Sequence, residues 1–146
     1  MPGAAALAGV TPPGPEAAGA GASTLALGVD IVEVDRLRAM VGRRGEDLLL
    51  RLLTGRELAA ARGARGLLWP RIASRVAAKE ATKKALGSRG QLARWTEVEV
   101  YTGAHGEPLL RLSGGTRLAA ARCGLTGLRL SLAHGKTLAI AVVVGW

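Results

Sequence analysis

The feature that most constrains the fold is one long helical segment in the middle of the chain. Over residues 70–86 the apolar residues recur with a period near 3.6, which is typical of an amphipathic α-helix. Pro70 suits the first turn of a helix and Gly87 suits the position after its last turn, so these residues set the expected bounds. After Gly87 the period changes to 2, the spacing of β-strands. The sequence therefore predicts helix and sheet in one chain.

Shorter periodic segments flank this helix. Alternation over residues 25–31 predicts a strand with Asp30 on one face and, on the other, Leu25, Leu27, Val29 and Ile31. Thr54 and Glu57 have the spacing of a capping box, which predicts a helix over residues 55–62. Further helices are expected over residues 35–43, 47–53 and 116–122, and further strands over 95–102, 107–112, 128–133 and 137–144. This order predicts an α+β domain in which one long helix packs on a largely antiparallel sheet.

The composition fits one compact domain. The chain has 146 residues, 49% hydrophobic and 3% aromatic, and because it has no Phe the core must consist of Leu, Val, Ile and Ala. Residues 1–24 are rich in Ala, Gly and Pro and are expected to form a flexible leader, so the folded domain covers residues 25–146. The single Cys123 excludes an internal disulfide, and no apolar run reaches the length of a membrane span. These features predict a soluble cytoplasmic protein.

The charge is uneven along the chain. From Arg36 onwards there are 20 basic groups and 7 acidic ones, a net charge of +13. Such a surface attracts polyanions, whether nucleic acids, membranes, nucleotides or acidic proteins. A nucleic-acid-binding protein is one interpretation, but the four aromatic residues do not alternate with basic ones, and the sequence has no zinc or helix-turn-helix signature. We therefore expect neither nucleic acid nor membrane as a partner.

Glu80 interrupts the apolar face of the long helix. On a helical projection it lies near the centre of the apolar arc, next to a basic stripe that is either a solvated face or a surface for phosphate groups. The arc consists of Ile72, Ala73, Val76 and Ala77, and the stripe of Arg71, Arg75, Lys79 and Lys83. A carboxylate at a buried position needs a compensating charge, either a lysine one turn away, such as Lys84, or a bound cation. With Asp30, Glu80 could give Mg²⁺ two hard oxygen ligands and leave the rest of its shell to water and substrate phosphates.

Four short motifs follow one another along the chain. They are Gly28-Val-Asp-Ile-Val-Glu-Val-Asp-Arg36, Arg51-Leu-Leu-Thr-Gly-Arg-Glu57, Arg75-Val-Ala-Ala-Lys-Glu-Ala-Thr-Lys-Lys-Ala-Leu-Gly87 and Ser131-Leu-Ala-His134. In this order they resemble the motifs of the bacterial holo-acyl-carrier-protein synthase family, and the resemblance covers about residues 25–145. It implies the 4′-phosphopantetheinyl transferase-like fold. It also implies an enzyme that moves 4′-phosphopantetheine from coenzyme A to a serine of apo acyl carrier protein and releases 3′,5′-ADP, where the carrier serves fatty-acid or polyketide biosynthesis.

The resemblance also implies the roles of individual residues. Asp30 and Glu80 match the metal ligands of the family, which hold Mg²⁺ against the pyrophosphate of coenzyme A, and Lys84 matches a lysine that contacts substrate phosphate. These three residues form the expected catalytic set. The expected coenzyme-binding residues are Arg75, Lys84, Gly87, Ser88 and His134. Arg36 matches an arginine that pairs with an acid on the carrier protein, and because family members are typically homotrimers with sites at subunit boundaries, we expect a homotrimer.

Three positions depart from the family pattern. Thr82 stands where Phe is usual, the Gly-Thr-Gly turn after the helix becomes Gly87-Ser-Arg-Gly90, and Gly135 replaces the Thr or Asp that usually follows the histidine. The coenzyme pocket is therefore expected to differ from that of the family. A relative that keeps the fold without the activity stays open as an alternative. The acceptor of the serine proton is either a metal-bound water or Glu80.

Overall fold

The computed structural model describes residues 25–146, so the predicted leader at residues 1–24 lies outside the described residues. The central element is α4 (Trp69–Ala85), which begins and ends one residue earlier than the sequence predicted. Pro70 lies in its first turn, and Gly87 follows the helix with a φ of +59°, a left-handed conformation that suits glycine. The start and stop signals read from the sequence are therefore confirmed. No helix within residues 25–146 is both long and apolar enough to span a membrane.

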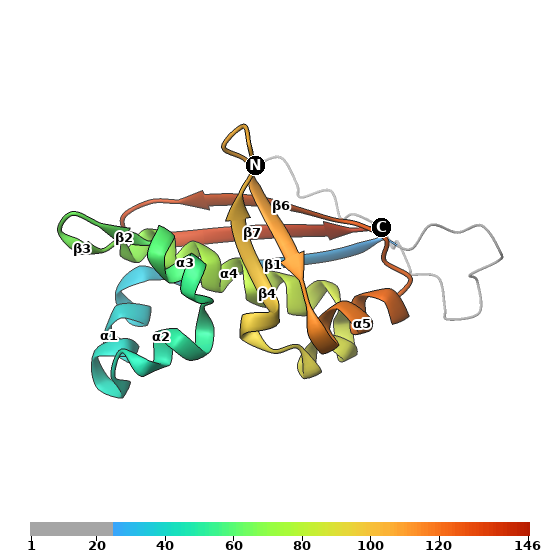
Figure 1. Cartoon of the computed structure of the whole chain (residues 1–146), viewed down its shortest axis with the longest axis horizontal. Coiled ribbons are helices and arrows are strands. Elements are labelled where there is room, and N and C mark those ends of the chain that lie inside the picture. The colour runs from blue at the N-terminus through green and yellow to red at the C-terminus, as the bar shows by residue number, and fades with distance from the viewer. Residues whose placement is uncertain (1–24) are drawn as a thin grey trace, which may run out of the picture.

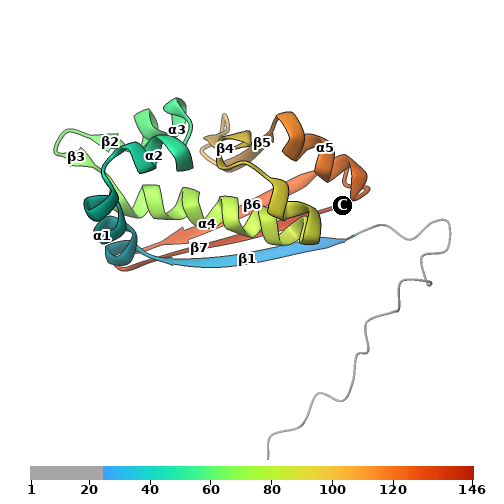
Figure 2. The same ribbon diagram turned by 90° about the horizontal axis from the view of Figure 1, so that it is seen from below.

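α4 packs on a three-stranded antiparallel sheet with the strand order β1-β7-β6. The strands are β1 (Ala26–Glu33), β6 (Leu128–His134) and β7 (Leu138–Gly145). Within residues 25–146 the first strand therefore pairs with the last one, as can be followed in Figure 1. Figure 2 shows three layers, with α4 between this sheet on one side and the smaller elements on the other.

The smaller elements lie before and after α4 along the chain. Those before it are α1 (Val34–Arg44), α2 (Asp47–Leu52), α3 (Gly55–Ala60), β2 (Arg62–Gly63) and β3 (Gly66–Leu67). Those after it are the 3₁₀ segments η1 (Gly87–Leu92) and η2 (Trp95–Glu97), then β4 (Val98–Thr102), β5 (Pro108–Leu112) and α5 (Gly114–Arg122). β2 pairs with β3 and β4 with β5, both antiparallel, so the arrangement agrees with the predicted α+β architecture.

Two predicted elements are shorter in the structure by two or three residues. The strand predicted at residues 95–102 begins only at Val98, because the carbonyl of Trp95 accepts a 2.7 Å hydrogen bond from Lys79 on α4 and the chain turns there. The helix predicted at residues 55–62 ends at Ala60, because the next residues form the short β2–β3 hairpin, which the periodicity did not predict. The capping box at the start of this helix is confirmed, since Thr54 and Glu57 exchange both hydrogen bonds.

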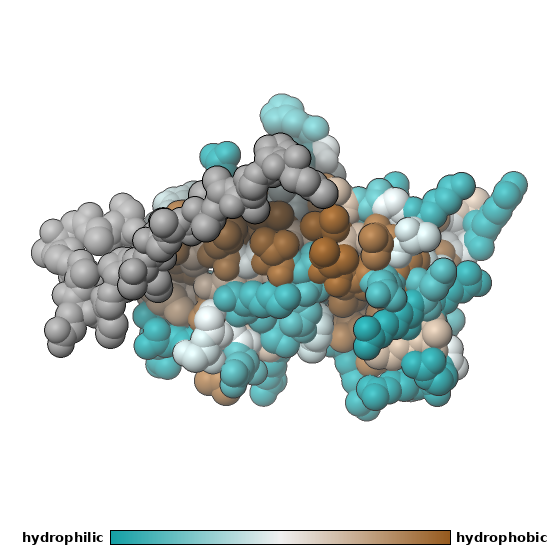
Figure 3. Space-filling model, turned by 180° about the vertical axis from the view of Figure 1, so that it is seen from behind, coloured by the Kyte–Doolittle hydropathy of each residue, from teal (hydrophilic) through white to brown (hydrophobic). Residues whose placement is uncertain are grey.

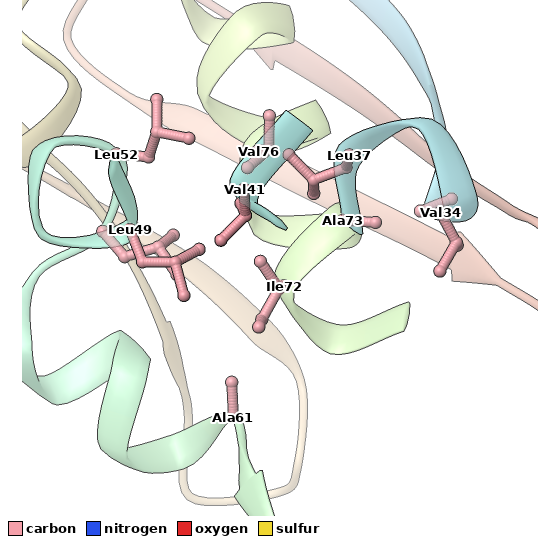
Figure 4. Packing of buried hydrophobic residues seen from close by; sticks show 11 residues of the cluster. Val34, Leu37, Val41, Leu49, Leu52, Ala61, Ile72, Ala73 and Val76 are labelled. Atoms are coloured by element: carbon pink, nitrogen blue, oxygen red, sulfur yellow. The ribbon is translucent and has the colours of Figure 1, made fainter. Parts of the chain in front are cut away.

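The main core lies between α4 and the helices that precede it, and it is aliphatic, as the lack of Phe predicted. Figure 4 shows side chains from α1, α2 and α4 converging on one another. The labelled residues of this cluster are Val34, Leu37, Val41, Leu49, Leu52, Ala61, Ile72, Ala73 and Val76. Burying such side chains contributes about 1.5–3 kcal/mol for each Val, Leu or Ile, so this cluster fixes α1 and α2 against the first half of α4.

The sheet approaches the second half of α4 closely because small residues line the contact. An added Cβ at Gly28 would overlap the carbonyl oxygen of Ala81. Ala77 and Ala81 are completely buried, in one cluster with Ala141 of β7. Since only glycine fits at position 28, β1 lies directly against the helix and brings Asp30 with it.

The other face of the sheet is apolar and open to solvent. Leu25, Leu27, Val29 and Ile31 share this face, as predicted, and between 44% and 75% of the surface of each is exposed. The register of the sheet places Ile140, Val142 and Val144 beside them. Figure 3 shows apolar residues gathered on this side of the molecule. Contiguous apolar surface of this kind marks interaction sites on soluble proteins.

Candidate functional site

Asp30 and Lys84 form a direct ion pair between β1 and α4. The Nζ of Lys84 lies 2.7 Å from Oδ1 of Asp30 and 3.0 Å from the carbonyl oxygen of Val29. The pair is open to water, because 54% of the Lys84 side chain and 16% of the Asp30 side chain are exposed. The prediction that Lys84 could compensate the charge of Glu80 is therefore wrong, since Lys84 pairs with Asp30 instead.

Glu80 pairs with Lys83, and Lys83 also contacts an aromatic ring. Its Nζ lies 3.2 Å from Oε1 of Glu80 and 4.6 Å from the centroid of the Trp95 ring. The Glu80 side chain is 32% exposed, so its predicted place at the centre of the buried face is wrong. Alanines such as Ala77 and Ala81 occupy the centre of that face, and Glu80 lies at its edge.

Asp30 contacts α4 one helical turn beyond Glu80. Residues four apart on a helix are neighbours on one side, so Lys84 lies one turn beyond Glu80. Since Lys84 contacts Asp30, β1 brings its carboxylate beside the part of the helix that carries Glu80. The structure thus brings Asp30 and Lys84 of the predicted catalytic set into contact, and Glu80 lies one helical turn before Lys84.

The donors of this region fit a hard cation that also binds substrate. Asp30 and Glu80 offer carboxylate oxygens with access to water, the ligands that Mg²⁺ prefers. In the described part of the chain, no three or more His, Cys, Asp or Glu side chains form a group that could hold a metal ion. A cation bound by Asp30 and Glu80 would need further oxygen ligands from water or from a phosphate-bearing substrate.

Arg75 and His134 lie apart from this region, at a basic cavity of about 400 Å³ near the start of α4. Arg75 is buried, and its Nη1 donates a 3.0 Å hydrogen bond to the carbonyl of Arg71. Its Nε has no hydrogen-bond partner among residues 25–146, and burial lowers the pKa of Arg75. Ser74 and Tyr101 also line this cavity. Along the helix, Arg75 lies roughly 13 Å from Lys84, given the rise of 1.5 Å per residue.

Gly87 and Ser88 begin η1 and are exposed, beyond the end of α4 that carries Lys84. Arg36 lies on α1, at a third place. It lines a cavity of about 470 Å³ with two further arginines, Arg43 and Arg44, over an apolar floor that includes Leu37 and Met40. The structure therefore distributes the predicted residues over three places.

One residue of the predicted basic stripe has a role that sequence reasoning missed. Lys79 is completely buried, and its Nζ lies 2.8 Å from Oε2 of Glu57. Burial lowers the pKa of Lys79, while the charge of Glu57 and its hydrogen bond to the lysine oppose this shift. Lys79 is therefore neither solvated nor available to phosphate. Helical periodicity alone could not reveal this pair, because Glu57 lies on another helix.

Comparisons with known proteins give consistent results. The family model described as the 4′-phosphopantetheinyl transferase superfamily matches residues 26–143. The holo-[acyl-carrier-protein] synthase of Desulforudis audaxviator is 42% identical over 123 residues, which cover 83% of this chain and 93% of the relative. Two solved structures are similar in fold. The synthase of Helicobacter pylori in complex with coenzyme A has a TM-score of 0.70 at 28% identity and covers 82% of this chain and 99% of that one. The synthase of Bacillus anthracis in complex with CoA (3′,5′-ADP) has a TM-score of 0.64 at 31% identity and covers 82% and 94%.

Proposed function

The chain belongs to the holo-[acyl-carrier-protein] synthase family of the 4′-phosphopantetheinyl transferase superfamily, and from this we propose which residues carry out its reaction. The resemblance read from the four motifs is confirmed, and so is the predicted fold. The chain is a transferase that moves 4′-phosphopantetheine from coenzyme A to a serine of apo acyl carrier protein, leaving 3′,5′-ADP. The interpretation as a nucleic-acid-binding protein is not needed to explain its positive charge.

We assign the transfer chemistry to Asp30, Glu80 and Lys84. The observation that supports this most strongly is the 2.7 Å contact between Lys84 and Asp30. It holds Asp30 beside a residue that lies one helical turn from Glu80 on α4. The two carboxylates would hold Mg²⁺, which when bound would neutralise charge on the pyrophosphate. Lys84 is half exposed and long enough to turn from Asp30 to a phosphate oxygen. Glu80 and a metal-bound water both stay open as acceptors of the serine proton.

We assign coenzyme binding to Lys84, Gly87, Ser88, Arg75 and His134. Phosphate groups favour arginine and lysine because charge-assisted hydrogen bonds to them are strong. The Nε of buried Arg75 has no hydrogen-bond partner within residues 25–146 and lies at a cavity that His134 also lines, which supports a phosphate contact there. The coenzyme carries a pyrophosphate and a separate ribose phosphate, so two basic regions roughly 13 Å apart along α4 suit an extended ligand.

The carrier protein would bind at the cavity beside Arg36. Three arginines and one glutamate, Glu33, line this cavity around an apolar floor, and the excess of positive charge suits an acidic segment with an apolar face. Arg36→Glu should therefore raise KM for the carrier about tenfold or more without changing coenzyme binding. Arg38→Glu, on the same helix but outside the cavity lining, is the matched control.

The homotrimer and the cytoplasmic location also stay proposals. The apolar outer face of the sheet supports the homotrimer, because further copies of the same chain could cover the exposed strip of Leu27, Val29 and Ile31. The single cysteine suits a reducing compartment.

The decisive experiment incubates the full chain with coenzyme A, Mg²⁺ and apo acyl carrier protein and follows the carrier by intact mass. Wild type should add one phosphopantetheine. Asp30→Asn and Glu80→Gln should lower the rate below detection while the circular dichroism spectrum stays unchanged, because each removes one ligand charge. Glu46→Gln, an exposed carboxylate before α2, is the control and should keep the wild-type rate. Wild-type rates in both site variants would refute the metal assignment, and no mass gain with any carrier would favour a relative that has lost the activity.

A further inference from the structure

Lys83 lies near the proposed catalytic set, and the transfer reaction does not explain its contacts. It lies between two groups, the carboxylate of Glu80 at 3.2 Å and the ring of Trp95 at 4.6 Å. Only 22% of its side chain is exposed, much less than for the neighbouring Lys84. A lysine held on two sides in this way has a defined position, unlike most surface lysines.

Trp95 is itself fixed. Its carbonyl accepts the hydrogen bond from buried Lys79, and its side chain packs against the main core cluster. A cation over an indole ring is attracted by the ring electrons, and the attraction is strongest for tryptophan. Trp95 therefore holds the ammonium group of Lys83 in a defined position, within reach of Glu80.

Each of the two proposed metal ligands thus has its own lysine. Lys84 neutralises Asp30 and Lys83 neutralises Glu80. A divalent cation that binds these carboxylates would come within a few ångströms of two ammonium groups and would be repelled by them. The repulsion falls when an anion accepts hydrogen bonds from the two lysines, and the pyrophosphate of the coenzyme is such an anion.

We propose that Lys83 is a positioning residue that couples cation binding to coenzyme binding. In contact with the Trp95 ring, Lys83 neutralises Glu80 while the coenzyme is absent. This keeps the affinity for a free divalent cation low. When the pyrophosphate arrives, its oxygens attract Lys83, and Glu80 is released to the cation. Binding of either ligand then favours the other by the same factor, as linkage requires. This inference rests on the proposed role of Asp30 and Glu80.

The test measures Mn²⁺ binding to the full chain by calorimetry, with and without coenzyme A. Lys83→Met removes the charge and keeps an apolar chain over Trp95, and Lys83→Arg keeps the charge. Without coenzyme, Lys83→Met should bind Mn²⁺ about fivefold more tightly than wild type, the size expected for one partly exposed charge. Coenzyme A should strengthen Mn²⁺ binding clearly in wild type and in Lys83→Arg, and much less in Lys83→Met. Equal or weaker Mn²⁺ binding in Lys83→Met overturns the proposal.

A spectroscopic measurement reports on the contact between Lys83 and Trp95. Because the ammonium group lies over the ring of Trp95, its departure should change the tryptophan emission when Mn²⁺ and coenzyme A are added together. The change should be absent in Trp95→Phe, although Trp69 and Trp146 remain. Emission that responds equally in wild type and in Trp95→Phe would contradict the release of Lys83.

An Asp30→Asn arm separates failure of this inference from failure of the proposed function. If the metal assignment holds, Asp30→Asn weakens Mn²⁺ binding whatever Lys83 does. If Asp30→Asn leaves Mn²⁺ binding unchanged, both the metal assignment and the coupling fall. If Asp30→Asn weakens it and Lys83→Met does not strengthen it, only the coupling falls.

Discussion

Two of the lysine–carboxylate pairs on α4, Lys79–Glu57 and Lys84–Asp30, have nearly the same length but differ in burial and in what surrounds them. The Lys79–Glu57 pair measures 2.8 Å, and neither side chain is exposed. The Lys84–Asp30 pair measures 2.7 Å, and 54% of its lysine is exposed. Equal distances therefore do not imply equal roles. Water access decides whether such a pair holds the fold together or can exchange its partner.

The buried pair is fixed because both charged groups make further hydrogen bonds. Lys79 also donates to the carbonyls of Trp95 and Val98, and Glu57 also accepts from the backbone N–H groups of Thr54 and Val100. Buried charges are tolerated only with such compensation. The network joins α3, α4 and the start of β4, so it stabilises the packing of these elements against one another. The open pair joins only β1 and α4, and its lysine can turn to a phosphate.

The largest expected effect comes from breaking the buried pair. Lys79→Met leaves Glu57 as a buried charge without its partner, which should lower the free energy of unfolding by about 3–5 kcal/mol. Urea denaturation followed by circular dichroism measures this loss. The double variant Glu57→Gln/Lys79→Met removes both charges and keeps an acceptor at position 57, so it should recover part of the loss. If the two variants were equally unstable, the isolated charge would not be the cause.

A methyl group between β1 and α4 should have the next largest effect. Gly28→Ala would push its Cβ into the carbonyl of Ala81, and overpacking of this kind costs about 1–3 kcal/mol. Because β1 carries Asp30, the transfer rate should fall as well, while the buried pair stays intact. Gly42→Ala is the matched control, since nothing lies within 4 Å of the added Cβ in α1 and alanine favours a helix by about 0.5–1 kcal/mol. A Gly28→Ala chain as stable and as active as wild type would show that the close contact can relax.

Lys84→Met reverses the pattern expected for Lys79→Met. Removing one partner of an exposed pair should change the free energy of unfolding by less than about 1 kcal/mol. The rate of transfer should nevertheless fall roughly 10²–10³-fold, the usual cost of losing one group that stabilises transition-state charge. Parallel measurement of urea stability and of carrier modification distinguishes the two. A stability loss as large as that of Lys79→Met would erase the distinction between the buried and the open pair.

The smallest expected effect concerns Glu97, which is held by hydrogen bonds to buried Thr116 rather than by a lysine. Its Oε2 accepts from the backbone N–H of Thr116 at 2.8 Å and from the Thr116 hydroxyl at 2.7 Å, and these bonds lower the pKa of Glu97 below its ordinary value of 4.5. A lowered carboxyl pKa stabilises the fold above the ordinary value, and the contribution is lost as the pH falls through the lowered one. Wild type should therefore exceed Glu97→Gln in stability at pH 7, and the gap should close as the pH falls below 4.5. A gap that does not vary with pH would refute this.

The sequence predicted what depends on neighbouring residues. Pro70 and Gly87 located α4 to within one residue, and Thr54 with Glu57 located the start of α3, because these signals act within a turn of helix. It failed where a distant residue decides. Lys84 pairs with a residue 54 positions away, and the strand beginning at Val98 is shortened by a lysine 16 positions before Trp95. Helical projection places a side chain on a face but cannot say what covers that face.

The pairing of β1 with β7 has a consequence for synthesis of the protein on the ribosome. The register joins Ala26 to Gly145 and Glu33 to Leu138, so β1 emerges more than 100 residues before the strand that it pairs with. Until then its apolar side chains have no sheet to join, and an unpaired strand of this kind is prone to aggregate. Closing so long a loop also slows folding. The nascent chain should therefore need protection, for example by a chaperone, until β7 has left the exit tunnel.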